Sequence, residues 1–434
     1  MLRILRQRDF SRLWLGGLIS MIGDWILIVG LPFEIYRRTG STLATGAMVL
    51  AYLIPSITLG SFAGVFVDRW DRKRLMVAVN VVLALAVLPL LLMDTLGIWI
   101  AYLVLVISSS LEQLFSPAEN ALLPNLLEHP DDDLVTANAL NGMNNHLARL
   151  IGPAVGGIIV AVGGMTAVAL IDAVSFVISA ALIGSIRARH TRAERADSLE
   201  HEATTAWARV VAEWRDGLRI VIRQPVLRAL LVFFVITRIG EGLTATLFVP
   251  WMTDALHSDS AGYGALLSTQ AVGGLAGAAV IGRMGKRLNP LRLLIIGALA
   301  FGLIDLALFT YPVLWPFIGP ALVAMVIVGV PGAAMVAGWT TLEQTLASDS
   351  HRGRVIAAIG AVASLGSLVG AGAAALIGQA VPVVPLLIVQ GSGYVIGGIV
   401  VAWMTRGERR GVGSGASSGS DASETGQPAI ERPN

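Results

Sequence analysis

The stretch "FAGVFVDRWDRKRLMV" (residues 62–77) places six charged side chains within seven positions, between two long apolar runs. The run before it is "ATGAMVLAYLIPSITLGS" (44–61), and the run after it is "AVNVVLALAVLPLLLM" (78–93). A helix needs about 20 predominantly apolar residues to cross the hydrocarbon layer of a membrane. The charged stretch therefore indicates a short loop between two membrane-spanning helices.

The composition agrees with a membrane protein. Of the 434 residues, 55% are hydrophobic and only 14% are charged, and the mean hydropathy is +0.73. Soluble domains have about 25% charged residues, so this chain has too little polar material to cover a soluble surface. It contains no cysteine, which excludes disulfides and thiolate metal sites. A net charge of +2 gives no reason to expect a nucleic-acid partner.

Similar apolar runs recur along the whole chain and predict an all-α membrane protein with twelve spans. The predicted spans are 12–36, 43–67, 75–94, 98–121, 138–162, 165–186, 227–252, 262–283, 291–311, 313–342, 354–380 and 384–404.

The positions of the basic residues predict how these helices are oriented, because Lys and Arg gather on the cytoplasmic side. All but four of the 31 Lys and Arg lie near the two termini or in alternate loops, including the loop at 68–74. The exceptions are Arg37 and Arg38 in an opposite loop, and Arg149 and Arg238 inside spans. We therefore expect both termini in the cytoplasm.

The chain is expected to divide into two six-helix halves. These are residues 1–186 and 227–404, joined by a cytoplasmic linker (187–226) and followed by a disordered Gly/Ser-rich tail (405–434). The second part of the linker has an amphipathic pattern, which suits a helix in the membrane interface or an ordinary surface helix. "AGVFVDRWDRKR" (63–74) aligns with "AGAAVIGRMGKR" (276–287), which indicates a worn duplication of one half.

Four stretches have a recognisable form. The first is the pattern Gly64, Asp68, Arg69, Arg72 and Lys73; the others are "FSPAENALLPNLL" (115–127), "ARLIGPAVGG" (148–157) and "DGLRIVIRQPVLRAL" (216–230). Together they resemble the major facilitator superfamily, in particular the drug-exporter branch of macrolide-efflux and siderophore-exporter-like proteins.

This resemblance covers residues 8–404 and implies a fold and a location. The fold would be two pseudo-symmetric six-helix bundles, with helices 1, 4, 7 and 10 around a central cavity, in a bacterial plasma membrane. Two positions depart from the family pattern. Asp71 replaces a glycine of the helix 2–3 signature, and Ser108 stands where many proton-coupled exporters carry an arginine.

The resemblance gives the two glycine-containing motifs mechanical roles. Gly64 would let helix 2 approach helix 11, while Asp68, Arg69, Arg72 and Lys73 would form a latch across the seam between the halves. We expect this latch to hold the inner side shut. Along helix 5, a second set of residues would pack closely on helix 8 near 273–282; it consists of Gly152, Pro153, Gly156 and Gly157.

Ionisable side chains inside the spans are costly and are therefore functional candidates. The proton-coupling candidates are Asp24, Glu112, Arg149, Arg238 and Glu241. We expect Asp24 to be the main proton acceptor, followed by Glu112, with Arg149 as the counter-ion of Glu112. The duplication would place Asp24 across the cavity from Arg238, and Arg238 shares a helix face with Glu241.

Other polar and aromatic residues receive simpler roles. Trp25, Tyr52, Phe115 and Trp339 are candidates for aromatic cavity walls. Asp172 and Asp305 fall in helices expected at the periphery, where a structural role is favoured.

The function expected from this sequence is proton-coupled export of small amphipathic or lipophilic compounds. We find no phosphate-binding loop for an ATP-driven pump and no enzyme, cofactor or metal signature. A monomer in the bilayer is expected, with protons and a small-molecule substrate as its partners. The alternatives are a lipid or lysolipid flippase, a proton-coupled importer of the same fold, and a membrane sensor that transports nothing.

Overall fold

The computed structural model describes residues 2–67, 70–187, 212, 214–284, 288–348 and 351–407, and all regular secondary structure in these residues is helical. Short 3-10 helices, η1 (Leu88–Leu92), η2 (Leu123–Leu126) and η4 (Tyr311–Val313), extend some helix ends. The α-helices are α1 (Leu2–Leu5), α2 (Arg8–Thr39), α3 (Thr42–Val67), α4 (Arg72–Val87), α5 (Met93–Leu96), α6 (Trp99–Leu122), α7 (Pro130–Gly184), α9 (Pro225–Asp254), α10 (Ser260–Met284), α11 (Pro290–Thr310), α12 (Ile318–Leu346), α13 (Arg352–Ile377) and α14 (Val383–Met404).

Most of these helices can cross a membrane. Ten described helices are long and apolar enough, or eleven when the bent pair Trp214–Arg223 and Pro225–Asp254 counts as one span. α7 has 55 residues, and its backbone leaves the helical region at Gly164 (φ 59°, ψ −162°), a conformation that favours glycine. Because the runs on both sides are long enough for one crossing, α7 corresponds to two predicted spans.

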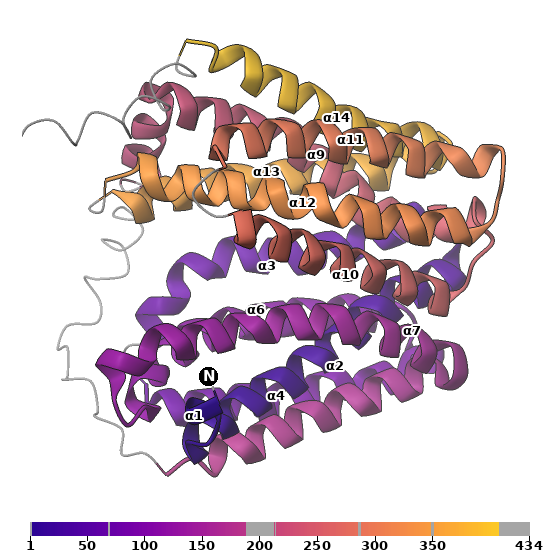
Figure 1. The fold of residues 1–434 in the computed structure, drawn as a ribbon. Coiled ribbons are helices and arrows are strands. Elements are labelled where there is room, and N and C mark those ends of the chain that lie inside the picture. The colour runs from indigo at the N-terminus through magenta and orange to yellow at the C-terminus, as the bar shows by residue number, and fades with distance from the viewer. Residues whose placement is uncertain are drawn as a thin grey trace, which may run out of the picture.

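The helices form two bundles. In the N-terminal bundle, α2, α3, α4, α6 and α7 surround one apolar core, and in the C-terminal bundle α9–α14 surround another. Figure 1 shows the two bundles side by side, with the helices of each running roughly parallel. The bundles meet where α7 contacts α10 and where α3 contacts α9 and α13. This arrangement confirms the expected all-α, two-bundle fold.

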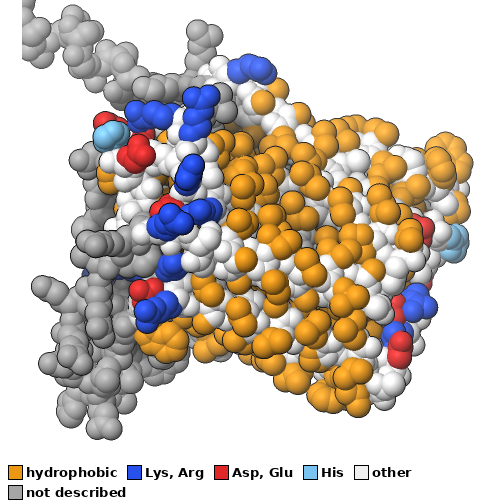
Figure 2. Space-filling view, turned by 90° about the horizontal axis from the view of Figure 1, so that it is seen from below, with side chains coloured by type: hydrophobic (Ala, Val, Ile, Leu, Met, Phe, Trp, Pro, Cys, Tyr) orange, Lys and Arg blue, Asp and Glu red, His pale blue; other side chains and the backbone are white. Residues whose placement is uncertain are grey.

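The outer surface has the pattern expected for a protein in a bilayer. Figure 2 shows a broad belt of hydrophobic side chains, with charged side chains confined to the two ends of the molecule. Large apolar residues such as Val162 (86% exposed) and Ile158 (59% exposed) lie on this surface without a protein partner to cover them. Helices suit this environment because their backbone hydrogen bonds are satisfied internally.

Described residues of the predicted latch bind within their own bundle rather than across the seam. Arg72 Nη1 donates to the Ala121 carbonyl at 2.9 Å, and Lys73 Nζ donates to the Ile186 carbonyl at 2.6 Å. Both carbonyls lie at helix C-termini, where cations are favoured. The predicted contacts across the seam belong to the state in which the inner side is shut, so they stay a prediction. Gly64 lies in α3, and Asp68 and Arg69 lie outside the described residues.

Asp71, which departs from the family pattern, has a local structural reason. Its side chain accepts a hydrogen bond from the Arg74 backbone N–H at 2.8 Å and caps the N-terminus of α4. Carboxylates are preferred at this position because the first N–H groups of a helix have no backbone partner.

Part of the predicted linker forms a helix that packs on the C-terminal bundle. A Cβ added to Gly217 would lie 2.8 Å from the Arg354 carbonyl carbon and 3.2 Å from Ala358, so this helix closely approaches the start of α13. Val221 is fully buried. These contacts agree with the surface-helix alternative. The remainder of the linker and most of the tail lie outside the described residues, so the domain boundaries stay predictions.

The small residues of α7 bring it close to α2 and α10, and α10 corresponds to the expected helix 8. A Cβ on Gly156 would lie 2.9 Å from the Ile26 Cα of α2, and one on Gly157 would lie 3.0 Å from the Ala261 Cα of α10. Gly152 closely approaches Trp25, and the Pro153 carbonyl lies against Gly264. α7 therefore meets the first turns of α10. The predicted contact with 273–282 is wrong, because Gly273 and Gly277 pack against α12.

Candidate functional site

A cavity of about 920 Å³ lies between the two bundles. Its walls come from α2, α3, α4, α6 and α7 on one side and from α9, α10 and α13 on the other. All but six of the lining residues belong to the N-terminal bundle. The fourth expected wall, helix 10, corresponds to α12, and no described residue of α12 lines the cavity. The cavity is therefore asymmetric between the bundles.

The aromatic candidates separate into two groups. Trp25, Tyr52 and Phe115 line the cavity. Trp339 instead packs edge-on against the Phe234 ring, with 5.3 Å between the ring centroids. The expectation that Trp339 forms a cavity wall is wrong for this conformation, because its side chain fills the space between α9 and α12.

Four of the five ionisable candidates line the cavity. Asp24 and Glu112 come from the N-terminal bundle, and Arg238 and Glu241 come from the C-terminal bundle; all four are half-buried. Asp24 interacts electrostatically with Glu112, and the Tyr52 hydroxyl lies 3.5 Å from Glu112 Oε2. The cavity thus holds acidic groups at mid-depth, where ionised side chains are costly.

The two charged cavity residues of the C-terminal bundle, Arg238 and Glu241, contact aromatic side chains. The Arg238 guanidinium carbon lies 5.5 Å from the Phe234 ring centroid, within range of a cation–π interaction. The Tyr394 hydroxyl donates a hydrogen bond to Glu241 Oε1. Although Arg238 and Glu241 share a face, no ion pair joins them in the described part of the chain. Asp24 and Arg238 line the same cavity, also without an ion pair between these two described side chains.

Arg149 does not act as the counter-ion of Glu112 in this conformation. Its Nη2 donates to Gln270 Oε1 of α10 at 3.0 Å, so it links the two bundles instead. The prediction failed because the sequence places Arg149 at the right depth but does not give the rotation of α7 about its axis.

Polar residues that the sequence analysis did not select also line the cavity. Asn138, Asn141 and Asn145 follow one face of α7, and their i, i+3, i+7 spacing could have revealed them. Glu119 of α6 lies with them; it is 6% exposed, and its Oε1 has no hydrogen-bond partner in the described structure. This part of the cavity lies toward the end of the molecule where α6 ends and α7 begins.

The opposite end, where α2 and α9 finish, is closed by hydrogen bonds between the bundles. Tyr36 Oη donates to Asp254 Oδ2 at 2.6 Å, and Ser260 Oγ donates to the Gly157 carbonyl at 3.1 Å. Gln379 Nε2 donates to Ser41 Oγ at 2.9 Å. We call this the closed end of the molecule.

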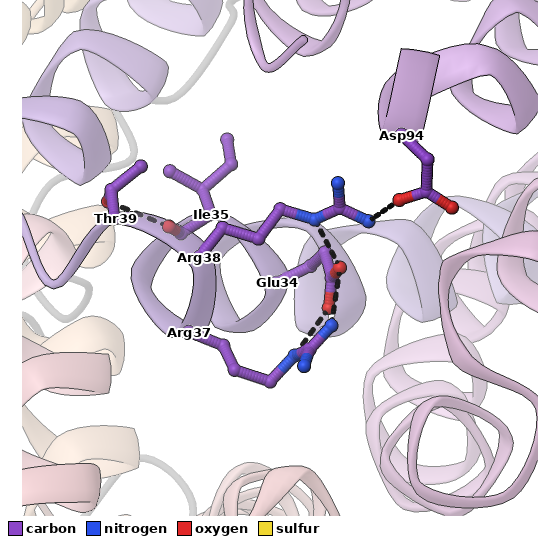
Figure 3. A network of polar contacts seen from close by, with 6 residues as sticks. All are labelled: Glu34, Ile35, Arg37, Arg38, Thr39 and Asp94. Carbon is purple, nitrogen blue, oxygen red and sulfur yellow. Dashed lines mark hydrogen bonds and ion pairs between the residues drawn. The ribbon is translucent and has the colours of Figure 1, made fainter.

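A compact ionic network lies beside the closed end (Figure 3). Glu34, which is 4% exposed, accepts two hydrogen bonds from Arg37 at 2.8 and 2.9 Å. Arg38 donates to both Glu34 and Asp94 at 2.5 Å. The two arginines that break the distribution of basic residues are thus matched by two carboxylates.

Comparisons with known proteins agree on one family. The family described as "Transmembrane secretion effector" matches residues 2–409. The chain is 28% identical to the multidrug efflux pump Tap of Mycobacterium tuberculosis over 352 residues, which cover 78% of this chain and 80% of Tap. It is 26% identical to macrolide efflux protein A of Streptococcus pyogenes over 226 residues, covering 51% of this chain and 53% of that protein.

A solved structure supports the fold. A mutant of the nucleoside transporter NupG superimposes with a TM-score of 0.71 at 12% identity, covering 91% of this chain and 99% of the NupG chain. No group of three or more His, Cys, Asp or Glu side chains in the described residues could hold a metal ion.

Proposed function

Because the chain belongs to the transmembrane secretion effector family of major facilitator transporters, we propose that it exports small amphipathic or lipophilic compounds in exchange for protons. The chain is a multi-pass membrane transporter and not an enzyme. Export would proceed by alternating access, in which two bundles rock about a binding site at their interface. One chain supplies both bundles, so we propose a monomer.

The observation that carries the proposal is the set of ionisable groups in the cavity. Asp24 and Glu112 lie on the N-terminal side, and Arg238 and Glu241 lie on the other. Each charge at the centre of a membrane costs about 2.5–3.5 kcal/mol on insertion scales. Proton transport gives these costly groups a function, because a carboxylate can gain a proton from one side of the membrane and release it to the other. We propose Asp24 as the main proton acceptor and Glu112 as the second.

The proton gradient supplies enough free energy for useful export. One proton moving down about 100 mV and one pH unit yields roughly 3.7 kcal/mol. That free energy supports a gradient of roughly 400-fold for a neutral compound.

Relatives and cavity composition support the proposed substrate class. Tap is described as a multidrug efflux pump, and the Streptococcus pyogenes relative is described as a macrolide efflux protein. Aromatic walls from Trp25, Tyr52 and Phe115 suit apolar parts of a substrate, while the carboxylates suit a basic group.

We propose that the closed end faces the outside and that both termini lie in the cytoplasm. Most Lys and Arg then lie on the cytoplasmic side, as the distribution rule requires. In this conformation the cavity would load from the cytoplasm. The latch of Gly64, Asp68, Arg69, Arg72 and Lys73 would form only when the cytoplasmic side closes.

The proposal predicts that Asp24→Asn abolishes proton-driven export while substrate binding survives. The measurement is growth of a host stripped of its own drug pumps on a panel containing a macrolide, a tetracycline and ethidium. Compounds that the wild-type protein makes tolerable are then tested for pH-driven counterflow in liposomes.

Asp94→Asn is the matched control, because Asp94 is an exposed carboxylate outside the cavity. It should retain full transport. Wild-type protein that protects against no compound on the panel would contradict drug export. Undiminished pH-driven counterflow in Asp24→Asn would remove Asp24 from the mechanism.

A further inference from the structure

Asp172 is a deeply buried carboxylate in the N-terminal bundle. It lies in the second half of α7, it is 0% exposed, and neither of its carboxylate oxygens has a hydrogen-bond partner in the described structure. Ser175 Oγ donates to the Asp172 backbone carbonyl at 2.8 Å, and the same hydroxyl also lies close to the Asp172 carboxylate. An ionised carboxylate in such a site would bear its full desolvation cost.

The carboxylate of Asp172 lies against α2 at the position next to Asp24. A Cβ added to Gly23, the residue before Asp24, would lie 2.6 Å from Asp172 Oδ1, so the side chain rests against the α2 backbone at this point. Only a glycine leaves room for it there. The Asp172 side chain thus lies against a cavity-lining helix, although the sequence favoured a structural role at the periphery.

Among the described residues, the titratable groups that interact with Asp172 are acidic. Asp24 of α2 and Glu112 of α6 interact with it electrostatically. The neighbouring helix α4 carries its titratable side chains, Arg72, Lys73 and Arg74, in its first turn and none in the turns that follow. No described set of side chains could hold a metal ion. Since the described residues bring neither a cation nor a metal site to this carboxylate, a bound proton is what can neutralise it.

We propose that Asp172 is a second proton-binding site, which is protonated in this conformation and exchanges its proton with Asp24. The Asp172 hydroxyl would pass its proton to the ionised Asp24, leaving Asp172 ionised and Asp24 neutral. Asp24 would then release that proton to the cavity. Its use in transport rests on the proposed proton coupling, and it extends that coupling from the cavity wall to the interior of the N-terminal bundle.

The C-terminal bundle contains a buried aspartate that differs in one decisive respect. Asp305 of α11 is 3% exposed, but its Oδ2 accepts a hydrogen bond from Gln390 Nε2 at 2.7 Å. Gln390 in turn accepts a hydrogen bond from Thr244. Asp305 is thus part of a satisfied network, which makes it a matched control for Asp172.

Infrared difference spectroscopy of the reconstituted protein over a pH series tests the proposal without a substrate. A protonated carboxyl that accepts no hydrogen bond absorbs at the high-frequency end of the carbonyl region. We expect one such band, exchangeable in D2O, to be lost in Asp172→Asn and in the smaller variant Asp172→Ser. It should remain in Asp305→Asn. Asp24→Asn should keep the band but shift the pH at which it disappears, because the two groups interact.

Persistence of the band in both Asp172 variants would overturn the proposal. So would a band that is insensitive to pH, or one that Asp24→Asn does not affect, since each would describe an isolated structural group. Transport assays separate this result from the proposed function. Wild-type liposomes that do not couple substrate to protons would contradict the export mechanism, whereas the infrared bands decide the protonation of Asp172.

Discussion

Glu34 shows how one buried residue accommodates two charges that otherwise break the chain's distribution of basic residues. Arg37 and Arg38 follow it at positions i+3 and i+4, and both donate to its carboxylate. Asp94 approaches Arg38 from the short helix α5. The pair of arginines therefore adds little net charge at the closed end.

At the residue scale, we expect Glu34→Gln to destabilise the protein by about 1–3 kcal/mol, because both guanidinium groups lose their ionised acceptor. The effect of Arg37 is partly screened, since its side chain is 62% exposed. Thermal unfolding in detergent measures this change.

Asp94→Asn serves as the control for that measurement. Its side chain is 78% exposed and pairs with Arg38, so its loss should cost at most about 1 kcal/mol. Equal destabilisation by the two variants would show that burial of Glu34 does not matter.

At the element scale, the contact between α7 and α10 depends on the missing side chain of Gly157. Its α-carbon faces the Ser260 carbonyl and the Ala261 Cα, and Ser260 returns a hydrogen bond to the Gly157 carbonyl. Two helices from different bundles thus touch through their backbones. Two helices that touch in this way can separate as rigid bodies, but the contact does not tolerate a larger side chain.

We expect Gly157→Leu to open the closed end, because the new side chain would collide with backbone atoms of α10. The chain has no cysteine, so spin labels can be attached without background through Leu43→Cys and Ala380→Cys. The distance between the labels should lengthen.

Gly360→Leu is the matched control in α13, where an added Cβ meets nothing within 4 Å. It should leave the label distance unchanged. An unchanged distance in Gly157→Leu would mean that the contact does not limit closure.

The elements themselves were largely predictable, whereas their rotations were not. Runs of about 20 apolar residues gave the spans, because hydrocarbon sets their length. A helix that is apolar on all sides gives no sign of which face meets lipid and which meets protein. Two residues, Arg149 and Trp339, were therefore given the wrong neighbours. The four charged cavity residues could be predicted from the sequence, because a charged side chain inside a span has few places to lie other than a cavity. They are Asp24, Glu112, Arg238 and Glu241.

At the scale of the whole molecule, the closed end is held by a small number of hydrogen bonds between separate apolar cores. The hydrogen bond from the Tyr36 hydroxyl to the Asp254 carboxylate, at 2.6 Å, joins α2 to α9. Hydrogen bonds to a charged acceptor such as a carboxylate are stronger than those between neutral groups. A few such bonds can balance two conformations, because their total free energy stays within a few kcal/mol.

We expect Tyr36→Phe to shift this balance toward opening of the closed end. Loss of a hydrogen bond to a charged group costs about 1.5–3 kcal/mol, which corresponds to a roughly 10- to 150-fold change in the ratio of the two conformations. The same pair of spin labels measures the two populations.

Tyr311→Phe provides the control, because the Tyr311 hydroxyl donates to the Phe317 carbonyl within the C-terminal bundle at 2.7 Å. Its loss should leave the ratio of conformations unchanged. A similar shift in both variants would indicate general loosening rather than release of the closed end.

The unequal walls of the cavity have a consequence for how this protein would evolve. Since all but six lining residues come from the N-terminal bundle, substitutions selected by exposure to unfamiliar compounds should accumulate in the first half of the gene. The second half of the gene would then diverge mainly at positions that contact lipid. Its few positions that contact the transported compound would change more slowly.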